Sequence, residues 1–280
     1  MNDRRITKAM LAQYRAYLES REKSANTVQK YMRDMNKFHT YAGDSTISKS
    51  SVIAYKEHLA RHYRYVSINS MLAAVNSFFI FIGWQDLCVK QFKIQKKAFC
   101  SAEEELTKEE YKRLVAAAER KNNERLSLVL QTICGTGMRI SELQFVTLEA
   151  VRRGVITVNC KGKTRSIMIV SALQKKLLRY AKAKKLTAGA LFTTRRGAPL
   201  DRSNVWREMK GLCREAGVSE TKVFPHNLRH LFARSFYEIK QDIAKLADLL
   251  GHSSLNTTRI YIMTTGKEHR RLLERMRLVT

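Results

Sequence analysis

Apolar residues recur at spacings of three and four along the first hundred residues, a pattern typical of amphipathic helices that pack against one another. The clearest stripe lies in segment 24–43 and consists of Val28, Tyr31, Met32, Met35 and Phe38. Similar stripes occupy residues 52–61 and 68–82, and a weaker one occupies residues 7–20. No run in this part of the chain alternates apolar and polar residues as a half-buried strand does. We therefore predict that residues 1–85 fold into a small bundle made only of helices.

The following segment, residues 86–105, has no apolar periodicity. It carries four lysines, which are Lys90, Lys93, Lys96 and Lys97. We predict that this segment is a basic linker. A helix start follows it, because Thr107 and Glu110 have the spacing of a capping box, in which each side chain binds the backbone of the other residue. A second domain is therefore expected over residues 106–280.

The second domain combines helices with a short hairpin. Helical patterns cover residues 107–120 and 124–134, and two β-rich runs follow at 154–160 and 165–170. The turn sequence KGKT separates these runs, which predicts an antiparallel hairpin. A third short strand near 191–194 is expected to join it, and the rest of the chain has helical patterns. The predicted fold class is thus mostly α with a small antiparallel β-sheet.

Positive charge is the strongest signal in the composition. The chain has 52 Lys and Arg against 25 Asp and Glu, a net charge of +27. Residues 1–100 contain 17 basic and 7 acidic residues, and residues 101–280 contain 35 and 18, so both parts share the excess. An excess of this size predicts a polyanionic partner, usually nucleic acid. An evenly basic surface with no such partner is the alternative interpretation.

The sequence also indicates a compartment. No apolar run reaches the roughly 18 residues that a membrane span needs, and the first thirty residues lack the apolar core of a signal peptide. The five cysteines are widely spaced and form no CxxC pair, which argues against a disulfide framework and against a zinc site. We therefore predict a soluble, intracellular protein without a membrane partner.

Two groups of polar residues precede and follow the first strand. Arg139 and Glu142 are three apart and would share one helix face, where a carboxylate can fix the orientation of a guanidinium group. Lys161 lies in the hairpin turn, with Lys163 and Arg165 close behind. A turn can present an ammonium group to a ligand. Taken alone, these residues are better explained as an ordinary surface ion pair and as solvated turn lysines.

The segment FPHNLRH is more specific. Its proline, Pro225, suits the first position of a helix, which would then open with His226, Arg229 and His230. Imidazole and guanidinium groups at the start of a helix suit a phosphate. Further on, Gly251 is expected to end a helix. His252 follows it directly, and Tyr261 comes nine residues later. Structural histidines and an amphipathic surface tyrosine are the alternatives for these residues.

In chain order, these residues form the pattern R-x-x-E, a hairpin lysine, H-x-x-R-H, G-H and a tyrosine. This order resembles the tyrosine recombinase (phage integrase) family over residues 107–270. The helical N-terminal part looks more loosely like the core-binding, SAM-like domain of the same family. The size of the chain and its short tail after the tyrosine are similar to the simple two-domain, Xer-like members.

The resemblance implies a role for each matching residue. Tyr261 would be the nucleophile, Arg139 and Arg229 the two catalytic arginines, Lys161 the general acid and His226 the base or proton relay. The remaining matches are His252 as a hydrogen-bond donor, with Glu142 and His230 in supporting positions. The turn CKGKTR is shorter than the common family form, so Lys163 stays open as the alternative acid. A free tyrosine has a pKa of about 10, so its phenol needs such help to act as a nucleophile.

The implied activity is cleavage and rejoining of DNA through a covalent 3′-phosphotyrosine, in integration, excision, inversion or resolution. No cofactor is expected, because the sequence has no aspartate cluster for magnesium and no GxxxxGK[ST] loop for ATP. A type IB topoisomerase-like enzyme and a catalytically silent DNA-binding regulator are the alternatives. The small helical first domain disfavours the first alternative, and the complete reactive set disfavours the second.

The resemblance also implies partners. These are double-stranded DNA with paired inverted half-sites, further copies in a synaptic tetramer on two duplexes, and in some systems accessory DNA-bending proteins. The expected DNA contacts are the helix over 24–42 and the side chains Lys90, Lys93, Lys96, Lys97, Lys163, Arg165, Asn204, Arg207 and Lys210. A final helix with Leu272, Leu273 and Met276 would dock either on a neighbouring protomer or on its own domain. The expected location is the cytoplasm of a bacterium, on the nucleoid, with the gene carried by the bacterium or a phage.

Overall fold

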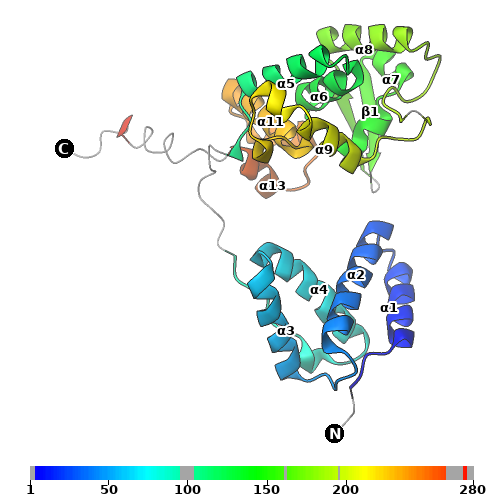
Figure 1. The fold of residues 1–280 in the computed structure, drawn as a ribbon, viewed down its shortest axis with the longest axis vertical. Helices are drawn as coiled ribbons and strands as arrows, with labels where there is room; N and C mark the ends of the chain where they lie inside the picture. The colour runs from blue at the N-terminus through cyan, green and yellow to red at the C-terminus, as the bar shows by residue number, and fades with distance from the viewer. Residues whose placement is uncertain (1–3, 95–103, 161–162, 195, 263–273, 276–280) are drawn as a thin grey trace. The chain divides into compact units, whose positions relative to one another are not determined.

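The computed structural model of the protein describes residues 4–94, 104–160, 163–194, 196–262 and 274–275. The chain divides into two compact units, Met1–Lys96 and Lys97–Thr280. Among the described residues, Figure 1 shows helices joined by turns in the first unit, and helices together with one hairpin in the second. The prediction of a mostly α protein with a small antiparallel sheet is confirmed.

The first unit is a bundle of four helices: α1 (Lys8–Ser20), α2 (Ala25–Ala42), α3 (Lys49–His62) and α4 (Tyr65–Phe81). The four helices predicted from apolar periodicity are all present. Helix α4 packs against both α2 and α3, and aromatic rings fill the space between the helices. Tyr14 contacts Phe78 edge-on, and Phe38 contacts Tyr55 and Phe79 in the same way. Such pairs bury large apolar areas, so they account for much of the stability of this unit.

The segment that follows α4 packs more tightly than a linker. A short 3₁₀ turn, η1 (Gln85–Leu87), leads into an extended stretch in which Leu87 and Val89 are buried in the core of the first unit. Asn76 holds the backbone of Val89 through two hydrogen bonds, of 3.0 and 2.8 Å. Asn69 holds Phe92 in the same way. The linker expected from residue 86 therefore does not begin there, because apolar burial and these asparagine contacts attach the chain as far as Phe92.

The second unit is built from nine helices and three short 3₁₀ turns among its described residues. Before the hairpin come α5 (Lys108–Arg120), α6 (Glu124–Thr136), η3 (Ile140–Phe145) and α7 (Leu148–Arg153). After the hairpin come α8 (Ser171–Ala183), α9 (Arg202–Lys210), α10 (Cys213–Ala216), η4 (Glu220–Lys222), α11 (Pro225–Lys240), α12 (Ile243–Leu250), α13 (Leu255–Arg259) and η5 (Ile260–Ile262). The capping box at Thr107 and Glu110 starts α5, and Pro225 is the first residue of α11, both as predicted.

The hairpin consists of β1 (Val155–Cys160) and β2 (Lys163–Met168), in which Val155 pairs with Met168 and Cys160 with Lys163. The predicted third strand is wrong. Within the described residues 191–194, only Thr193 makes an isolated bridge, and its partner is Pro199 rather than the hairpin. Leu191 and Phe192 are apolar because they pack into the core, and burial alone cannot distinguish such a run from a strand.

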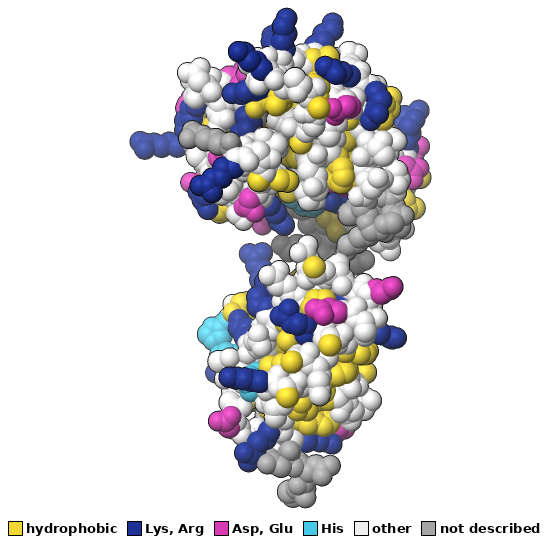
Figure 2. Space-filling model, turned by 90° about the vertical axis from the view of Figure 1, so that its right-hand side faces the viewer, with side chains coloured by type: hydrophobic (Ala, Val, Ile, Leu, Met, Phe, Trp, Pro, Cys, Tyr) yellow, Lys and Arg dark blue, Asp and Glu magenta, His cyan; other side chains and the backbone are white. Residues whose placement is uncertain are grey.

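The distribution of charged side chains on the surface agrees with the basic composition of the chain. On the face drawn in Figure 2, Lys and Arg side chains are spread over both units and outnumber Asp and Glu. Among the residues that the structure describes, no helix is long and apolar enough to cross a membrane.

Candidate active site

The first part of the site is the turn that follows α6. Gly137 ends this helix with φ of +66°, and a Cβ atom there would lie 2.4 Å from the ring of Phe232, so only glycine fits. Arg139 and Glu142 come next, on a short 3₁₀ turn rather than on the predicted helix face. The Glu142 carboxylate accepts from the Arg139 backbone N–H at 2.6 Å and from its Nη1 at 3.1 Å. The side chain of Arg139 is 44% exposed, so its guanidinium group is held by Glu142 and is still accessible to a ligand.

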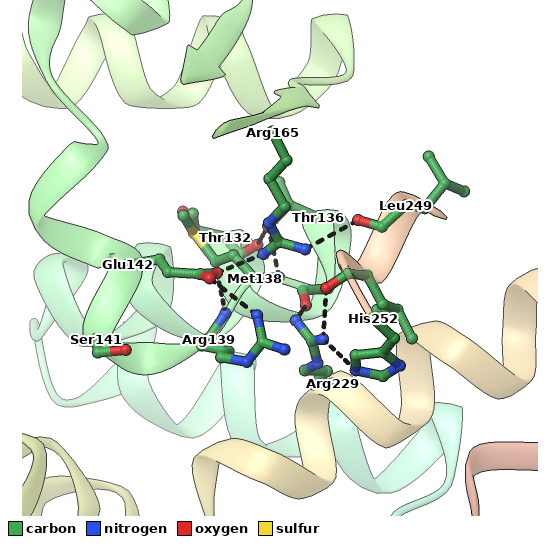
Figure 3. A network of polar contacts seen from close by, with 12 residues as sticks. Thr132, Thr136, Met138, Arg139, Ser141, Glu142, Arg165, Arg229, Leu249 and His252 are labelled. Carbon is green, nitrogen blue, oxygen red and sulfur yellow. Dashed lines mark hydrogen bonds and ion pairs between the residues drawn. The ribbon is translucent and has the colours of Figure 1, made fainter. Parts of the chain in front are cut away.

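Arg165 on β2 joins this turn to the end of α12 (Figure 3). Its Nη2 donates to Glu142 Oε2 at 2.5 Å, and its Nη1 donates to the carbonyl oxygen of Leu249 at 3.1 Å. A Cβ atom at Gly251 would lie 2.6 Å from Arg165 Cδ, so the arginine packs directly on this glycine. The side chain is only 14% exposed. Arg165 is predicted to contact DNA, whereas the structure places its side chain inside this network.

Arg165→Gln is therefore expected to weaken the site from within. The change leaves the buried Glu142 carboxylate with one cation fewer, which should cost about 2 kcal/mol of folding free energy. Thermal unfolding of the variant and of Arg165→Lys, compared with the exposed Arg179→Gln, measures this cost. An Arg165→Gln melting temperature equal to that of Arg179→Gln would show that the ion pair contributes nothing.

Arg229, one turn into α11, is the most deeply buried charged group of the site, with 1% of its surface exposed. Its Nη1 donates to the carbonyl of Gly137 at 2.6 Å, and its Nη2 donates to Leu250 O and to His252 Nε2, both at 2.8 Å. A guanidinium has five N–H groups, so two remain after these three bonds. One of them is Nε–H, which is buried without a partner among the described residues. The guanidinium is thus fixed by backbone carbonyls and retains donors for an anion.

The arginine contact also decides which nitrogen of His252 carries a proton. Because arginine only donates, His252 Nε2 accepts. The neutral ring then carries its proton on Nδ1, which lies 2.8 Å from Thr258 Oγ1. Burial lowers the pKa of His252 to about 4, and the positive charges of Arg229, Arg139 and Arg165 contribute to the shift.

Tyr261, on η5, is 4% exposed and packs with Ala233, Leu246 and Leu250 in a small apolar cluster. The alternative of an exposed surface tyrosine is therefore wrong. Three imidazole rings surround the phenol. The ring centroid of Tyr261 lies 4.3 Å from that of His230, 5.5 Å from that of His252 and 5.6 Å from that of His226.

The phenol oxygen of Tyr261 lies between a base and a cation. It is 3.4 Å from His226 Nε2. It also interacts with Arg229, because burial and Arg139 lower the pKa of this guanidinium while the Tyr261 phenol acts in the opposite direction. A hydroxyl placed between an imidazole and a buried guanidinium is the arrangement needed to activate a nucleophile toward an anionic ester.

Known proteins share both the sequence and the fold. The model of the phage integrase family matches residues 104–268, and that of the phage integrase N-terminal SAM-like domain matches residues 11–86. The chain belongs to the phage integrase family. Its relatives include the tyrosine recombinase XerA of Pyrococcus furiosus, 32% identical over 100% of this chain and 98% of that protein. XerA of Pyrococcus horikoshii is 31% identical over 98% and 95% of the two chains.

Two solved structures illustrate the shared fold of this phage integrase family member. The crystal structure of XerA recombinase is 25% identical, covers 98% of this chain and 100% of its own, and has a TM-score of 0.55. The XerH site-specific recombinase bound to difH substrate is 21% identical, covers 98% and 85%, and has a TM-score of 0.71. The chain is a Xer-like tyrosine recombinase in its sequence and fold.

Some of the remaining predicted site residues lie outside the described part of the chain, and the others differ in their exposure and contacts. Lys161, Lys96, Lys97, Leu272, Leu273 and Met276 lie outside the described residues. Lys163 belongs to β2 and pairs through its backbone with Cys160. Lys90, Lys93 and Arg207 are exposed, and Arg207 donates to Asn204 Oδ1 at 3.1 Å. The ammonium group of Lys210 contacts the carbonyl of Glu220 and the ring of Trp206, so it is already engaged within the unit.

The three histidines around the phenol are all shifted toward the neutral form. Burial lowers the pKa of His230 to about 4, with help from His226, Arg234 and Arg229. Burial also lowers the pKa of His226, and Arg229, Arg139 and Arg202 add to this shift. A neutral His226 at neutral pH can accept a proton, which a base requires.

These shifts predict a pH dependence of stability. Below a pH of about 6.5 an unfolded histidine binds a proton that folded His230 and His252 refuse until about pH 4, so stability falls as pH falls through this window. For the more buried His230 the loss is expected to reach about 1 kcal/mol per pH unit. Melting temperatures between pH 7.5 and pH 5 measure it. His230→Gln should flatten the curve and the exposed His62→Gln should not, and equal slopes for the two variants would contradict this explanation.

Proposed function

We propose that this chain is a site-specific DNA recombinase that cleaves and rejoins DNA through a covalent 3′-phosphotyrosine at Tyr261. The observation that carries the proposal is the buried phenol, which contacts His226 and Arg229 and is enclosed by three imidazoles. Membership of the phage integrase family supports it, since tyrosine recombinases of this family catalyse DNA cleavage and rejoining. Integration, excision, inversion and resolution all use this chemistry.

In the proposed cleavage step, the Tyr261 oxygen forms a bond to phosphorus and the bond from phosphorus to the 5′-oxygen breaks. His226 takes the phenol proton, and a general acid delivers a proton to the departing 5′-oxygen. Arg139 and the free N–H groups of Arg229 bind the non-bridging oxygens, on which negative charge accumulates. Glu142 holds Arg139 in place. Rejoining reverses the step, with a 5′-hydroxyl of the partner duplex as nucleophile.

Two guanidinium groups supply the positive charge that the transition state needs, so the proposed reaction requires no metal ion. The energy of the phosphodiester bond is kept in the tyrosyl linkage, so it requires no ATP either. Incubation of the protein with a nicked suicide substrate carrying its recombination site, in the presence of a chelator, tests the function. A covalent protein–DNA adduct is expected. Binding without any adduct would favour a silent DNA-binding regulator.

Exchange of strands distinguishes the proposal from a topoisomerase-like activity. A recombinase joins the cleaved ends of two site-bearing duplexes, whereas an enzyme that only nicks and reseals relaxes a supercoiled plasmid without producing recombinant molecules. We expect recombinant products from a plasmid with two sites, and relaxation alone would contradict the proposal.

Lys161 is the proposed general acid, with Lys163 as the alternative. Lys161→Ala is expected to slow cleavage by about 10²–10⁴-fold, the usual contribution of a general acid. A substrate with a 5′-bridging phosphorothiolate should restore the rate, because a thiolate leaves without protonation. Cleavage assays of Lys161→Ala and Lys163→Ala on both substrates decide between them. Rescue confined to Lys163→Ala would transfer the role to that residue.

The proposed partners are double-stranded DNA with paired inverted half-sites and further copies of the chain in a synaptic tetramer on two duplexes. Solved structures of similar fold include a XerH recombinase on difH substrate and a lambda integrase tetramer bound to a Holliday junction. The net charge of +27 supports a DNA partner, and binding should therefore weaken steeply with salt. Accessory DNA-bending proteins and docking of the C-terminal helix on a neighbouring protomer belong to the same proposal. The relatives are bacterial and archaeal recombinases, so we place the activity in the cytoplasm, on the nucleoid.

A further inference from the structure

Thr258 is a buried hydroxyl at the centre of the site that the sequence pattern did not single out. It lies on α13, which continues directly into η5, and it precedes Tyr261 by three residues. None of its surface is exposed. Its Oγ1 lies 2.8 Å from His252 Nδ1, while the opposite ring nitrogen contacts Arg229. The hydroxyl thus connects the segment that carries the nucleophile to the arginine and histidine pair.

We propose that Thr258 is a positioning residue that provides a hydrogen-bond partner for His252 Nδ1 in either neutral tautomer and ties the ring to the segment that carries Tyr261. The inference rests on the proposed function, because it concerns the same nucleophile and the same phosphate site. In the free protein, His252 Nε2 accepts from Arg229, so Nδ1 carries the proton and Thr258 Oγ1 accepts it. Burial and the arginine charges lower the pKa of His252 and so favour the neutral ring, and the Arg229 contact selects this tautomer.

Binding of a phosphate changes the hydrogen-bonding role that is required of His252 Nε2. To donate to a non-bridging oxygen, Nε2 has to carry a proton. In the neutral ring, the single proton then sits on Nε2 instead of Nδ1, and Nδ1 becomes an acceptor. A hydroxyl can rotate and either accept or donate, so Thr258 satisfies Nδ1 in both states. Valine has nearly the same shape but satisfies neither state, and it would leave a buried polar nitrogen without a partner.

The hydrogen bond between Thr258 and His252 also affects the distance between His252 and Tyr261. The rings of His252 and Tyr261 stack with an interplanar angle of 17°. Because Thr258 and Tyr261 belong to one continuous helical segment, the hydrogen bond at Thr258 fixes how far this segment lies from His252. A loss of the bond would leave Nδ1 without a partner and would disturb the placement of the imidazole and the phenol together, while the DNA-contacting surface stays unchanged.

Thr258→Val, Thr258→Ala and Thr258→Ser test the proposal. Cleavage of a suicide substrate at a saturating protein concentration should slow by on the order of 10- to 100-fold in the first two and by less than about threefold in the serine variant, which keeps the hydroxyl. The dissociation constant for uncleaved DNA should stay unchanged in all three. Two variants without the hydroxyl guard against a defect that comes from one side chain's shape alone.

The ¹⁵N chemical shifts of His252 in the free, labelled protein give a second measurement that does not depend on activity. The wild type and Thr258→Ser should show a proton on Nδ1 with the shifts of a hydrogen-bonded N–H. Thr258→Val should keep this proton, because Arg229 still donates to Nε2, but should lose the shift that the hydrogen bond causes. Unchanged Nδ1–H shifts in Thr258→Val, or a serine variant as slow as the valine variant, would overturn the proposal. Failure of the wild type to form any adduct would instead reject the proposed function, because the Nδ1–H bond is measured without DNA.

Discussion

Tyr261→Phe is expected to abolish formation of the covalent protein–DNA adduct, with a decrease in cleavage rate of at least about 10⁴-fold. The variant lacks the oxygen that attacks phosphorus and keeps the ring that packs against His230 and His252. Its fold and its affinity for DNA should therefore change little. Cleavage on a nicked suicide substrate, a gel-shift titration and a thermal melt together separate these effects.

Tyr237→Phe is the matched control. Tyr237 packs at the edge of the same small apolar cluster as Tyr261, so the two changes remove one hydroxyl each from neighbouring positions. The control should form adducts at close to the wild-type rate. Adducts from Tyr261→Phe, or their loss in Tyr237→Phe, would contradict the assignment of the nucleophile.

Arg229→Lys is expected to reduce cleavage by about 10³-fold or more while keeping the positive charge. A lysine ammonium cannot reach Gly137 O, Leu250 O and His252 Nε2 with the fixed fork that holds the guanidinium. Buried carbonyls would lose their donors, so the melting temperature should fall as well, by an amount that corresponds to about 3 kcal/mol. Single-turnover cleavage and thermal unfolding are the two measurements.

The exposed Arg214→Lys on α10 is the control for this change, and it should behave like the wild type in both measurements. An Arg229→Lys variant that melts like the wild type and cleaves within about tenfold of it would show that charge alone, without the fork, is what the site needs. We expect the opposite, since Arg229 both holds backbone carbonyls and is proposed to bind the phosphate.

Much of the fold follows from local patterns in the sequence. The stripe from Val28 to Phe38 predicts α2, and the Thr107–Glu110 box predicts the start of α5, because helix periodicity and capping depend on neighbouring residues. The prediction of a third strand is wrong because Leu191 and Phe192 are apolar in order to pack into the core. The predicted domain boundary after residue 85 is wrong because Asn69 and Asn76 on α4 hydrogen-bond to the backbone of the following segment.

The sequence predicts which residues form the site, but it does not predict which of them contact one another. The order of Arg139, Arg229 and Tyr261 along the chain marked them, and the structure brings them together. Two features depend on contacts between distant elements, and local spacing carries no signal for either of them. One is the placement of Arg165 between Glu142 and Leu249, and the other is the burial of the Tyr261 ring against α11 and α12.

The chemical identity of the linkage tests the central claim most directly. The wild-type protein is trapped on a suicide substrate, digested with nuclease and protease, and the modified peptide is sequenced by mass spectrometry. We expect a single nucleotide-bearing residue, Tyr261, joined through its oxygen to a 3′-phosphate. A nucleotide on any other residue, or a 5′-phosphate linkage, would contradict the account.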